Sequence, residues 1–246
     1  MKLQKTKAPL SLPILIFVLF ALSGPASADE RAAKALNARG YELYKQKKYE
    51  EALELFQKSV EADETYGQAH YNIACTLCVL RKLKMICEHD AYRGDIICHL
   101  QLTLKYMPTK KAKMLADSDL TPVHDTFGWQ MLKGLSPDDP AHLAAILTNV
   151  RWYGPAPGVY GPMSGIEFKA DGSFRHWRLN IDTDSPRKQY SSGKYSVGKG
   201  KIKLIFDRKP EKTNGKREFT GHLSRSGVLQ IEELESFTDD PDECSA

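Results

Sequence analysis

The fold is decided by residues 31–63, which read RAAKALNARGYELYKQKKYEEALELFQKSVEAD. Apolar and small residues recur there at spacings of three and four, as they do along one face of an α-helix. The first stripe is Leu36, Gly40, Leu43 and Tyr44, and the second is Tyr49, Ala52, Leu53, Phe56 and Val60. Only the polar segment 45–48 separates the stripes, and two helices joined by so short a turn pack antiparallel as a hairpin.

Four of these residues resemble the signature of a known repeat. The tetratricopeptide repeat is 34 residues long, and its small–Tyr–Ala–Phe positions match Gly40, Tyr49, Ala52 and Phe56. This copy departs from the full pattern where Leu36 replaces an aromatic residue, Ser59 an alanine and Glu64 a proline. The resemblance implies helix pairs that stack and bury a shared core, with the four matching residues packed between the helices.

A second copy is expected 34 residues further along the chain. Its first helix carries Tyr71, Ile73, Ala74 and Leu77, with Ala74 at the position of Gly40. Its second helix is predicted over residues 95–107, which requires an insertion of about ten residues, 82–92, between the two helices. Residues 110–132 then predict one more helix, an acidic N-cap before Leu120 and a short closing helix. The tetratricopeptide-like domain is predicted to span residues 29–135.

Beyond residue 135 the pattern changes from helices to strands. Residues 136–150 predict a linker and a short helix, residues 151–235 a strand-rich domain, and residues 236–246 an acidic tail. The predicted strands are 165–169, 174–181, 194–197, 201–206, 217–220 and 228–231. Such a meander favours a small antiparallel sheet that curls into a barrel or half-barrel. The expected fold class is therefore α+β, with helical hairpins followed by this sheet.

The strand-rich half also distantly resembles lipocalin-like domains. The matching segments are Trp152–Gly154, the Asp171–Gly172 turn and Gly193–Tyr195. The resemblance bears on the fold alone, and the sequence leaves open whether the interior is filled or holds a ligand.

Residues 1–28 are typical of a secretory signal peptide. Lys2, Lys5 and Lys7 precede an apolar run at 12–22, and Ala26–Ala28 offers small residues for cleavage. The run of 11 residues is shorter than the roughly 20 that a spanning helix needs. The alternative is an uncleaved, short membrane anchor. We expect an exported protein that begins near Asp29 and lies in a bacterial periplasm or is secreted.

Four cysteines gather in the second repeat: Cys75, Cys78, Cys87 and Cys98. In an exported chain they predict disulfide bonds, in which Cys75 or Cys78 pairs with Cys87 or Cys98. Cys244 remains as the odd thiol. The alternatives are a zinc site, which would also use His89 and His99, and a redox-active pair. Because the spacing fits no familiar module, we expect no metal and no other cofactor.

Signals for catalysis are absent from the sequence. It contains no G-x-S-x-G, H-E-x-x-H, phosphate-binding loop or dinucleotide-binding glycine pattern. The segment 175–178, RHWR, mixes basic and aromatic residues as a nucleic-acid or glycan surface does. In a strand, however, Arg175 and Trp177 face away from His176 and Arg178, which favours ordinary sheet packing. We expect a non-enzymatic protein without catalytic residues that binds no nucleic acid.

The tetratricopeptide resemblance implies a protein–protein interaction scaffold with a concave groove for a partner segment. By repeat position, this groove is lined by Asn37, Tyr41, Tyr44, Gln68, Tyr71, Asn72, Cys75 and Cys78. The alternative is that the tyrosines only pack between units. The family's clamp for C-terminal carboxylates needs a lysine where this chain has Asn37 and an asparagine where it has Tyr41. Of the clamp positions, only Asn72 fits. We therefore expect an apolar or amide-reading peptide partner. A second hypothesis is a small-ligand or lipid carrier, with the helices as adaptor.

The net charge of +4 is distributed unevenly. The predicted signal peptide accounts for three of these charges. Residues 151–225 hold 16 lysine and arginine residues against seven acidic ones, and residues 226–246 hold seven acidic residues and no basic ones. One interpretation is an acidic tail that offsets the basic sheet and aids solubility. The other is a basic sheet that meets anionic envelope components, with the tail as a competitor.

Overall fold

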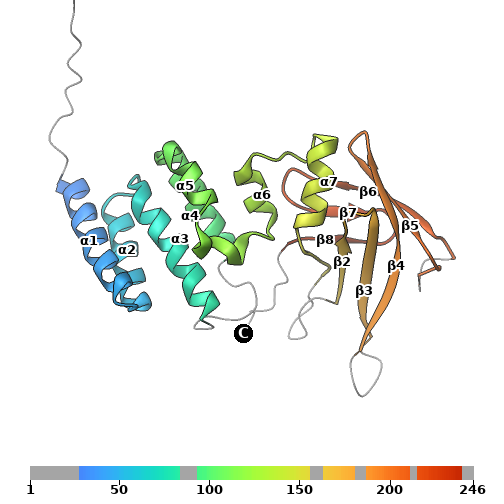
Figure 1. Ribbon diagram of the computed structural model, residues 1–246, viewed down its shortest axis with the longest axis horizontal. Helices are drawn as coiled ribbons and strands as arrows, with labels where there is room; N and C mark the ends of the chain where they lie inside the picture. The colour runs from blue at the N-terminus through green and yellow to red at the C-terminus, as the bar shows by residue number, and fades with distance from the viewer. Residues whose placement is uncertain (1–27, 84–92, 156–162, 181–186, 211–214, 240–246) are drawn as a thin grey trace, which may run out of the picture.

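The computed structural model describes residues 28–83, 93–155, 163–180, 187–210 and 215–239. The helices follow one another from the N-terminus to the middle of the chain, and the strands form one sheet in the C-terminal half (Figure 1). This is the α+β arrangement that the sequence predicts. The predicted signal peptide lies outside the described residues, except for Ala28. Among the described residues, no helix combines the length and the hydropathy that crossing a membrane requires.

The first helical hairpin consists of α1 (Ala28–Lys45) and α2 (Tyr49–Ala62). A glycine sets the distance between the two helices, because a Cβ atom at Gly40 would lie 2.8 Å from Cε1 of Phe56 and 3.2 Å from the carbonyl oxygen of Ala52. Phe56 and Ala52 are both fully buried, so neither atom can move away cheaply. Tyr49 is half-buried and meets the ring of Tyr44 edge to face, with 5.2 Å between centroids.

The second hairpin consists of α3 (Gly67–Lys82) and α4 (Arg93–Tyr106). Ala74 and the predicted equivalent positions Ile96, Leu100 and Thr103 are all fully buried. The helix that was predicted over 95–107 thus begins at Arg93, two residues before the predicted start, and ends at Tyr106, one residue before the predicted end. Most of the predicted insertion, residues 84–92, lies outside the described residues.

The array closes with four short helices: η1 (Pro108–Lys110), α5 (Lys111–Leu115), η2 (Ser118–Val123) and α6 (Phe127–Lys133). The predicted acidic N-cap is Asp117, whose Oδ1 accepts a hydrogen bond of 2.9 Å from the backbone N–H of Asp119. Leu120 and Trp129 then pack into the helical core together with Phe56, Ala74 and Leu100. These residues cover the last apolar face of the array, as the terminal unit of a repeat array must.

The C-terminal half is an eight-stranded antiparallel meander in the order β1 to β8. Its strands are β1 (Trp152–Tyr153), β2 (Ser164–Phe168), β3 (Ser173–Asn180), β4 (Arg187–Gly198), β5 (Lys201–Phe206), β6 (Glu218–Leu223), β7 (Leu229–Ile231) and β8 (Glu235–Phe237). Tyr153 and Thr238 exchange backbone hydrogen bonds of 2.7 and 2.8 Å, so the first and last strands meet. The sheet is a nearly closed barrel, which agrees with the predicted barrel or half-barrel.

Two strands were not predicted, β4 begins at Arg187 and not at residue 194, and two boundaries between regions also differ. The sequence missed β1 and β8, because segments of two and three residues are too short to show alternation. Phe237 is fully buried in the barrel core, so the sheet extends past residue 235 into the predicted acidic tail. The predicted linker helix is α7 (Pro140–Asn149), which belongs to the barrel, because Leu143, Ile146 and Leu147 are fully buried in that core.

The barrel interior is filled by side chains. Phe168, Phe174, Phe206, Phe219 and Phe237 all belong to its core. Phe206 is central, with ring centroids 4.8 Å from Phe174 and 5.4 Å from Phe219, both edge to face. The sequence left open whether the barrel interior is filled. Around Phe206 the interior is packed with aromatic rings.

Two histidines meet inside the second hairpin. Nε2 of His70 lies 2.8 Å from the carbonyl oxygen of Glu64, and its Nδ1 lies 2.8 Å from Nδ1 of His99. A carbonyl only accepts, so His70 carries a proton on Nε2. Burial is the main cause that lowers the pKa of His99, followed by the charge of His70, while Asp95 opposes them. Burial therefore favours the neutral form of His99, while the ring of His70 stacks on that of Tyr106.

We predict that the substitution Gly40→Val destabilises the protein by about 1–3 kcal/mol, the usual cost of overpacking a core. The matched control is Gly94→Val in α4, where an added Cβ atom has nothing within 4 Å and the expected change is at most about 0.5 kcal/mol. Urea denaturation of both variants measures the difference. Equal stability of the two variants would contradict the close approach of α1 and α2.

We also predict that His99 makes the protein sensitive to acid. Its pKa is lowered in the folded state, so its contribution is complete above about pH 6.5, the unfolded value, and is lost as the pH falls below it. Urea unfolding at about pH 7.5 and about pH 5.5 should show a smaller loss of stability for His99→Gln than for the unaltered protein. His222→Gln on β6, at an exposed residue, serves as control and should keep the full loss.

Candidate partner-binding groove

A cavity of about 400 Å³ lies in the helical half, between α1, α3 and the segment that follows α4. It is lined by Asn37, Ala38, Tyr41, Tyr44, Phe56, Gln68, Tyr71, Asn72, Cys75, Lys110, Lys113, Asp117 and Asp119, which we call the groove. Seven of the eight residues that the sequence placed along the groove are among them. Cys78, which the sequence also placed there, is fully buried in the helical core.

The tyrosines of the groove differ in exposure. Tyr41 is 49% exposed and stacks on Tyr44, with the ring centroids 6.4 Å apart. Tyr44 is half-buried, and Tyr71 is 4% exposed. The alternative that the tyrosines pack between units therefore describes Tyr71 well and Tyr41 poorly. Tyr41 presents half of its surface to anything that enters the groove.

A relay of amide side chains crosses the groove floor. Nζ of Lys110 donates to Oε1 of Gln68 over 2.7 Å, and Nε2 of Gln68 donates to Oδ1 of Asn72 over 2.8 Å. Nδ2 of Asn72 then donates to Oδ1 of Asn37 over 2.8 Å. Each bond uses one donor and one acceptor of an amide that has more of both. The relay therefore fixes the orientation of the amides and keeps further hydrogen-bonding capacity for a ligand.

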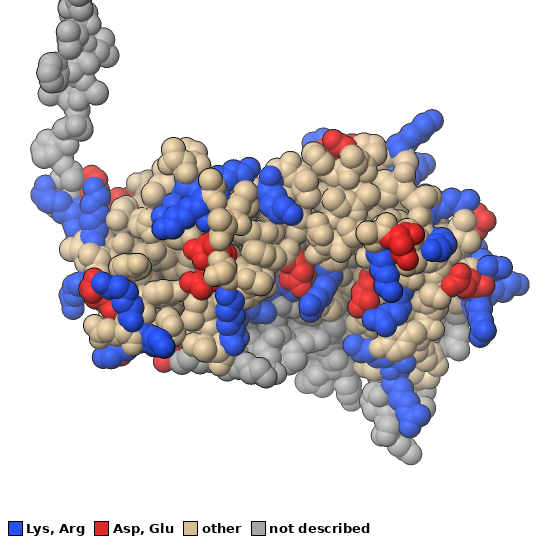
Figure 2. Space-filling model, viewed as in Figure 1, with Lys and Arg blue, Asp and Glu red and all other residues tan. Residues whose placement is uncertain are grey.

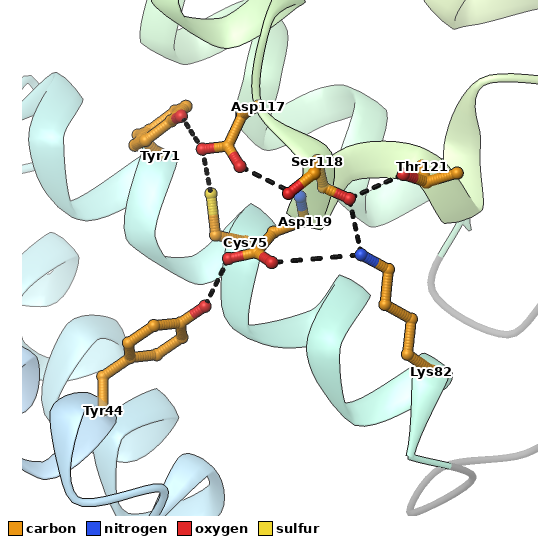
Figure 3. A network of polar contacts seen from close by, with 8 residues as sticks. All are labelled: Tyr44, Tyr71, Cys75, Lys82, Asp117, Ser118, Asp119 and Thr121. Atoms are coloured by element: carbon orange, nitrogen blue, oxygen red, sulfur yellow. Dashed lines mark hydrogen bonds and ion pairs between the residues drawn. The ribbon is translucent and has the colours of Figure 1, made fainter.

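Two aspartates anchor the other end of the groove (Figure 3). The hydroxyl of Tyr44 donates to Oδ2 of Asp119 over 2.8 Å, and the hydroxyl of Tyr71 donates to Oδ2 of Asp117. Burial first, with the neighbouring carboxylates adding to it, raises the pKa of both tyrosines far above the ordinary value. Both phenols therefore remain hydrogen-bond donors. Lys82 lies 3.9 Å from Oδ1 of Asp119 and donates to the carbonyl oxygen of Ser118.

Two lysines form the basic side of the groove. Nζ of Lys110 lies 4.5 Å from the centre of the Tyr71 ring, a cation–π contact. Burial, followed by the charge of Lys113, lowers the pKa of Lys110. Sequence reasoning missed both lysines, and it found Asp117 only as a helix cap. These residues lie after Pro108, beyond the repeat pattern that located the other lining residues.

The structure does not contain the disulfide bonds that the sequence predicts among Cys75, Cys78 and Cys98. All three are free thiols, and Cys87 lies outside the described residues. Cys75 and Cys78 are buried in α3, whereas Cys98 is exposed on α4. The prediction was wrong for these three residues. It relied on the expected export of the protein and on cysteine spacing, and neither shows on which face of its helix each thiol lies.

The groove has the chemistry of a binding site. Burial raises the pKa of the Cys75 thiol well above its ordinary value, with Asp117 next in effect, so this sulfur is a poor nucleophile. Among the described residues, no group of three or more histidine, cysteine or acidic side chains is arranged to hold a metal ion. What the groove offers is hydrogen bonds, one exposed aromatic ring and charges of both signs.

The charged face of the barrel is mixed. In Figure 2, basic and acidic side chains are interspersed over this half. Several of them pair: Arg175 with Glu167 at 3.0 Å, Lys203 with Glu218 at 2.9 Å and Lys216 with Glu233 at 2.7 Å. The outward Arg175 is half-exposed, whereas His176 on the other face of β3 is buried, as strand alternation predicts.

Comparison with protein families supports the prediction that the first hairpin is a tetratricopeptide-like repeat. A family model described as "Tetratricopeptide repeat" matches residues 33–66. The matched segment holds Gly40, Tyr49, Ala52 and Phe56, and also the groove residues Asn37, Tyr41 and Tyr44. A search of curated proteins finds no match for this chain. The helical N-terminal region is therefore tetratricopeptide-like.

The exposure of the thiols predicts how fast they react. In the folded protein at about pH 8, Cys98 should react first with a thiol reagent, while Cys75 and Cys78 should react only after unfolding. Burial raises the pKa of Cys78 to about 12, which slows it further. Peptide mapping by mass spectrometry after timed labelling measures the order. A disulfide-linked peptide that contains any of the three would contradict the free-thiol assignment.

Proposed function

We propose that this protein is a non-enzymatic interaction scaffold whose groove binds an extended segment of a partner protein. The observation that carries the proposal is the amide relay beside the exposed ring of Tyr41, in one cavity on a tetratricopeptide-like hairpin. Peptide backbone offers alternating N–H donors and C=O acceptors. Asparagine and glutamine side chains match both groups, whereas a carboxylate or an ammonium matches only one.

The charges of the groove specify the partner further. Lys110 and Lys113 lie on one side, and Asp117 and Asp119 lie at the end held by the tyrosines. A segment with an acidic side chain toward the lysines and an apolar or aromatic side chain over Tyr41 complements this arrangement. A volume of about 400 Å³ accommodates a few side chains, so we expect the groove to bind a short sequence motif of the partner.

We further propose that the protein acts after export, in a bacterial periplasm or outside the cell. The support is the basic, apolar and small-residue pattern of residues 1–28. Intact-mass measurement of the mature protein checks this proposal, since a chain that keeps Lys2 to Lys7 would contradict it. The free thiols of Cys75 and Cys78 are compatible with export, because both are buried away from oxidants.

The groove can be tested with peptides selected from a displayed random library on the full chain. We expect Tyr41→Ala to weaken a selected peptide by about tenfold, the loss of about 1.4 kcal/mol expected of an aromatic contact at the centre of an interface. The matched control is Tyr190→Ala on β4, which removes a tyrosine of similar exposure, 58% against 49%, from the barrel. It should bind the peptide as the unaltered protein does.

A second variant tests the amide relay. Asn72→Leu keeps the branched shape of the side chain and removes the amide between Gln68 and Asn37, so binding should weaken at least as much as in Tyr41→Ala. Circular dichroism and urea unfolding verify that the variant is folded. Peptides that bind the two groove variants and the barrel control equally well would overturn the proposal.

A further inference from the structure

The barrel has an opening in its wall on one side of β4. Pairing of β4 with β5 ends at Gly193 and Phe206, whereas β4 continues beside β3 back to Arg187. A cavity of about 740 Å³ lies at this opening. Arg178 and Ser191 line it from β3 and β4, and Arg208 and Lys209 line it from the segment that leaves β5. Cavities of this size are typical of sites for small molecules.

The cavity reaches a polar layer inside the barrel. Phe174 and His176 both point inward from β3, and the ring of His176 lies edge to face with Phe206 and Phe237, with centroids 6.1 and 6.2 Å apart. His176 therefore sits directly on the aromatic core, with only 4% of its surface exposed. It forms the floor of the cavity.

Beneath this floor lies a partly buried cluster of charged and polar side chains centred on Glu235, whose side chain is 13% exposed. One of its carboxylate oxygens is 3.2 Å from Nε2 of His176 and 3.1 Å from the guanidinium of Arg178, and the other accepts from the hydroxyl of Ser164. Burial raises the pKa of Glu235, but the hydrogen bonds from His176 and Ser164 and the charges of His176 and Arg178 outweigh it, so the pKa is lowered. The carboxylate holds His176 and Arg178 in place.

The groups that remain for a ligand are mostly donors and cations. A guanidinium has five N–H donors, of which the contact with Glu235 uses one, so Arg178 can still donate into the cavity. Nδ1 of His176 faces the hydroxyl of Ser191 at 3.4 Å, a long contact that a ligand atom could replace. Arg208 and Lys209 add two cations, while the carboxylate of Asp207 accepts from Ser192 over 2.7 Å. The cavity is thus electropositive.

We propose that this opening, lined by Arg178, Ser191, Arg208 and Lys209 above His176, binds a small organic anion through a carboxylate or phosphate group. Guanidinium groups pair with both anions through two parallel hydrogen bonds, and the ammonium of Lys209 adds charge. The aromatic rings of Phe206 and Phe237, against which His176 packs, exclude water on the inner side, which strengthens these contacts. The site is separate from the groove and does not depend on a partner protein.

Calorimetric titration of the full chain with succinate, a dicarboxylate, and with glycerol 2-phosphate, a phosphate monoester, tests the proposal. The titrations use an ionic strength of about 0.15 M, which screens scattered surface charge. We expect saturable binding of at least one anion, and the anion that binds more tightly identifies the ligand class. Arg208→Gln should weaken that binding by about tenfold or more, as expected for the loss of a charge-assisted hydrogen bond.

Lys201→Gln is the matched control, since it removes one positive charge from β5 at an exposed residue outside the cavity. It should change the affinity by less than about twofold, as is usual for surface charges away from a site. Arg208→Gln lies at an exposed residue, so the variant is expected to fold. Absence of saturable binding of both anions, or an equal loss in Lys201→Gln and Arg208→Gln, would overturn the proposal. The groove variant Tyr41→Ala should keep its anion binding, which separates this site from the proposed scaffold function.

Discussion

The rest of the structure depends on α6, because its residues serve two hydrophobic cores at once. Phe127 packs into the barrel core, and Trp129 packs into the helical core. The helix is held closely on both sides: the backbone N–H of Phe127 donates to Asp239 over 2.6 Å, and a Cβ atom at Gly128 would lie 2.5 Å from Cγ2 of Ile97. Phe127 and Trp129 are both buried, so a rotation of α6 would withdraw both side chains from their cores. The two halves therefore meet at α6.

The groove follows from the same constraint. To reach α6, the chain after α4 turns back over α3, and Asp117 makes this turn stable by capping η2 while it accepts the hydroxyl of Tyr71. The third wall of the groove is thus provided by the closing segment and not by a third repeat. Since Tyr71 and Tyr44 are tied to aspartates, recognition is left to the amides and to Tyr41. A groove whose polar groups are already oriented loses little conformational entropy when a ligand binds.

The sequence predicted the parts of the fold that rest on long periodic segments. Residues 31–63 showed two helical stripes and one short turn, so the hairpin and its small residue at Gly40 followed from spacing alone. Repeat position likewise placed Asn37 and Asn72 on one cavity. Prediction failed where a feature depends on contacts between distant residues. The short strands β1 and β8 are defined by their pairing with β2 and β7, and α7 belongs to the barrel because of where its apolar side packs. The lysines of the groove come from a segment without any repeat.

The folded structure accounts for part of the uneven distribution of acidic and basic residues along the sequence. Part of the acidic C-terminal stretch is paired within the chain, since Glu233 forms a surface ion pair with Lys216, Glu235 contacts His176 and Asp239 accepts from the backbone of α6. A buried carboxylate with an imidazole and a guanidinium is rarely the most stable filling of such a space, because desolvation costs about as much as pairing returns, and apolar side chains of equal volume often do better. The position of Glu235 instead fits the anion site that we propose, because its carboxylate contacts both His176 and Arg178 at the opening of the barrel.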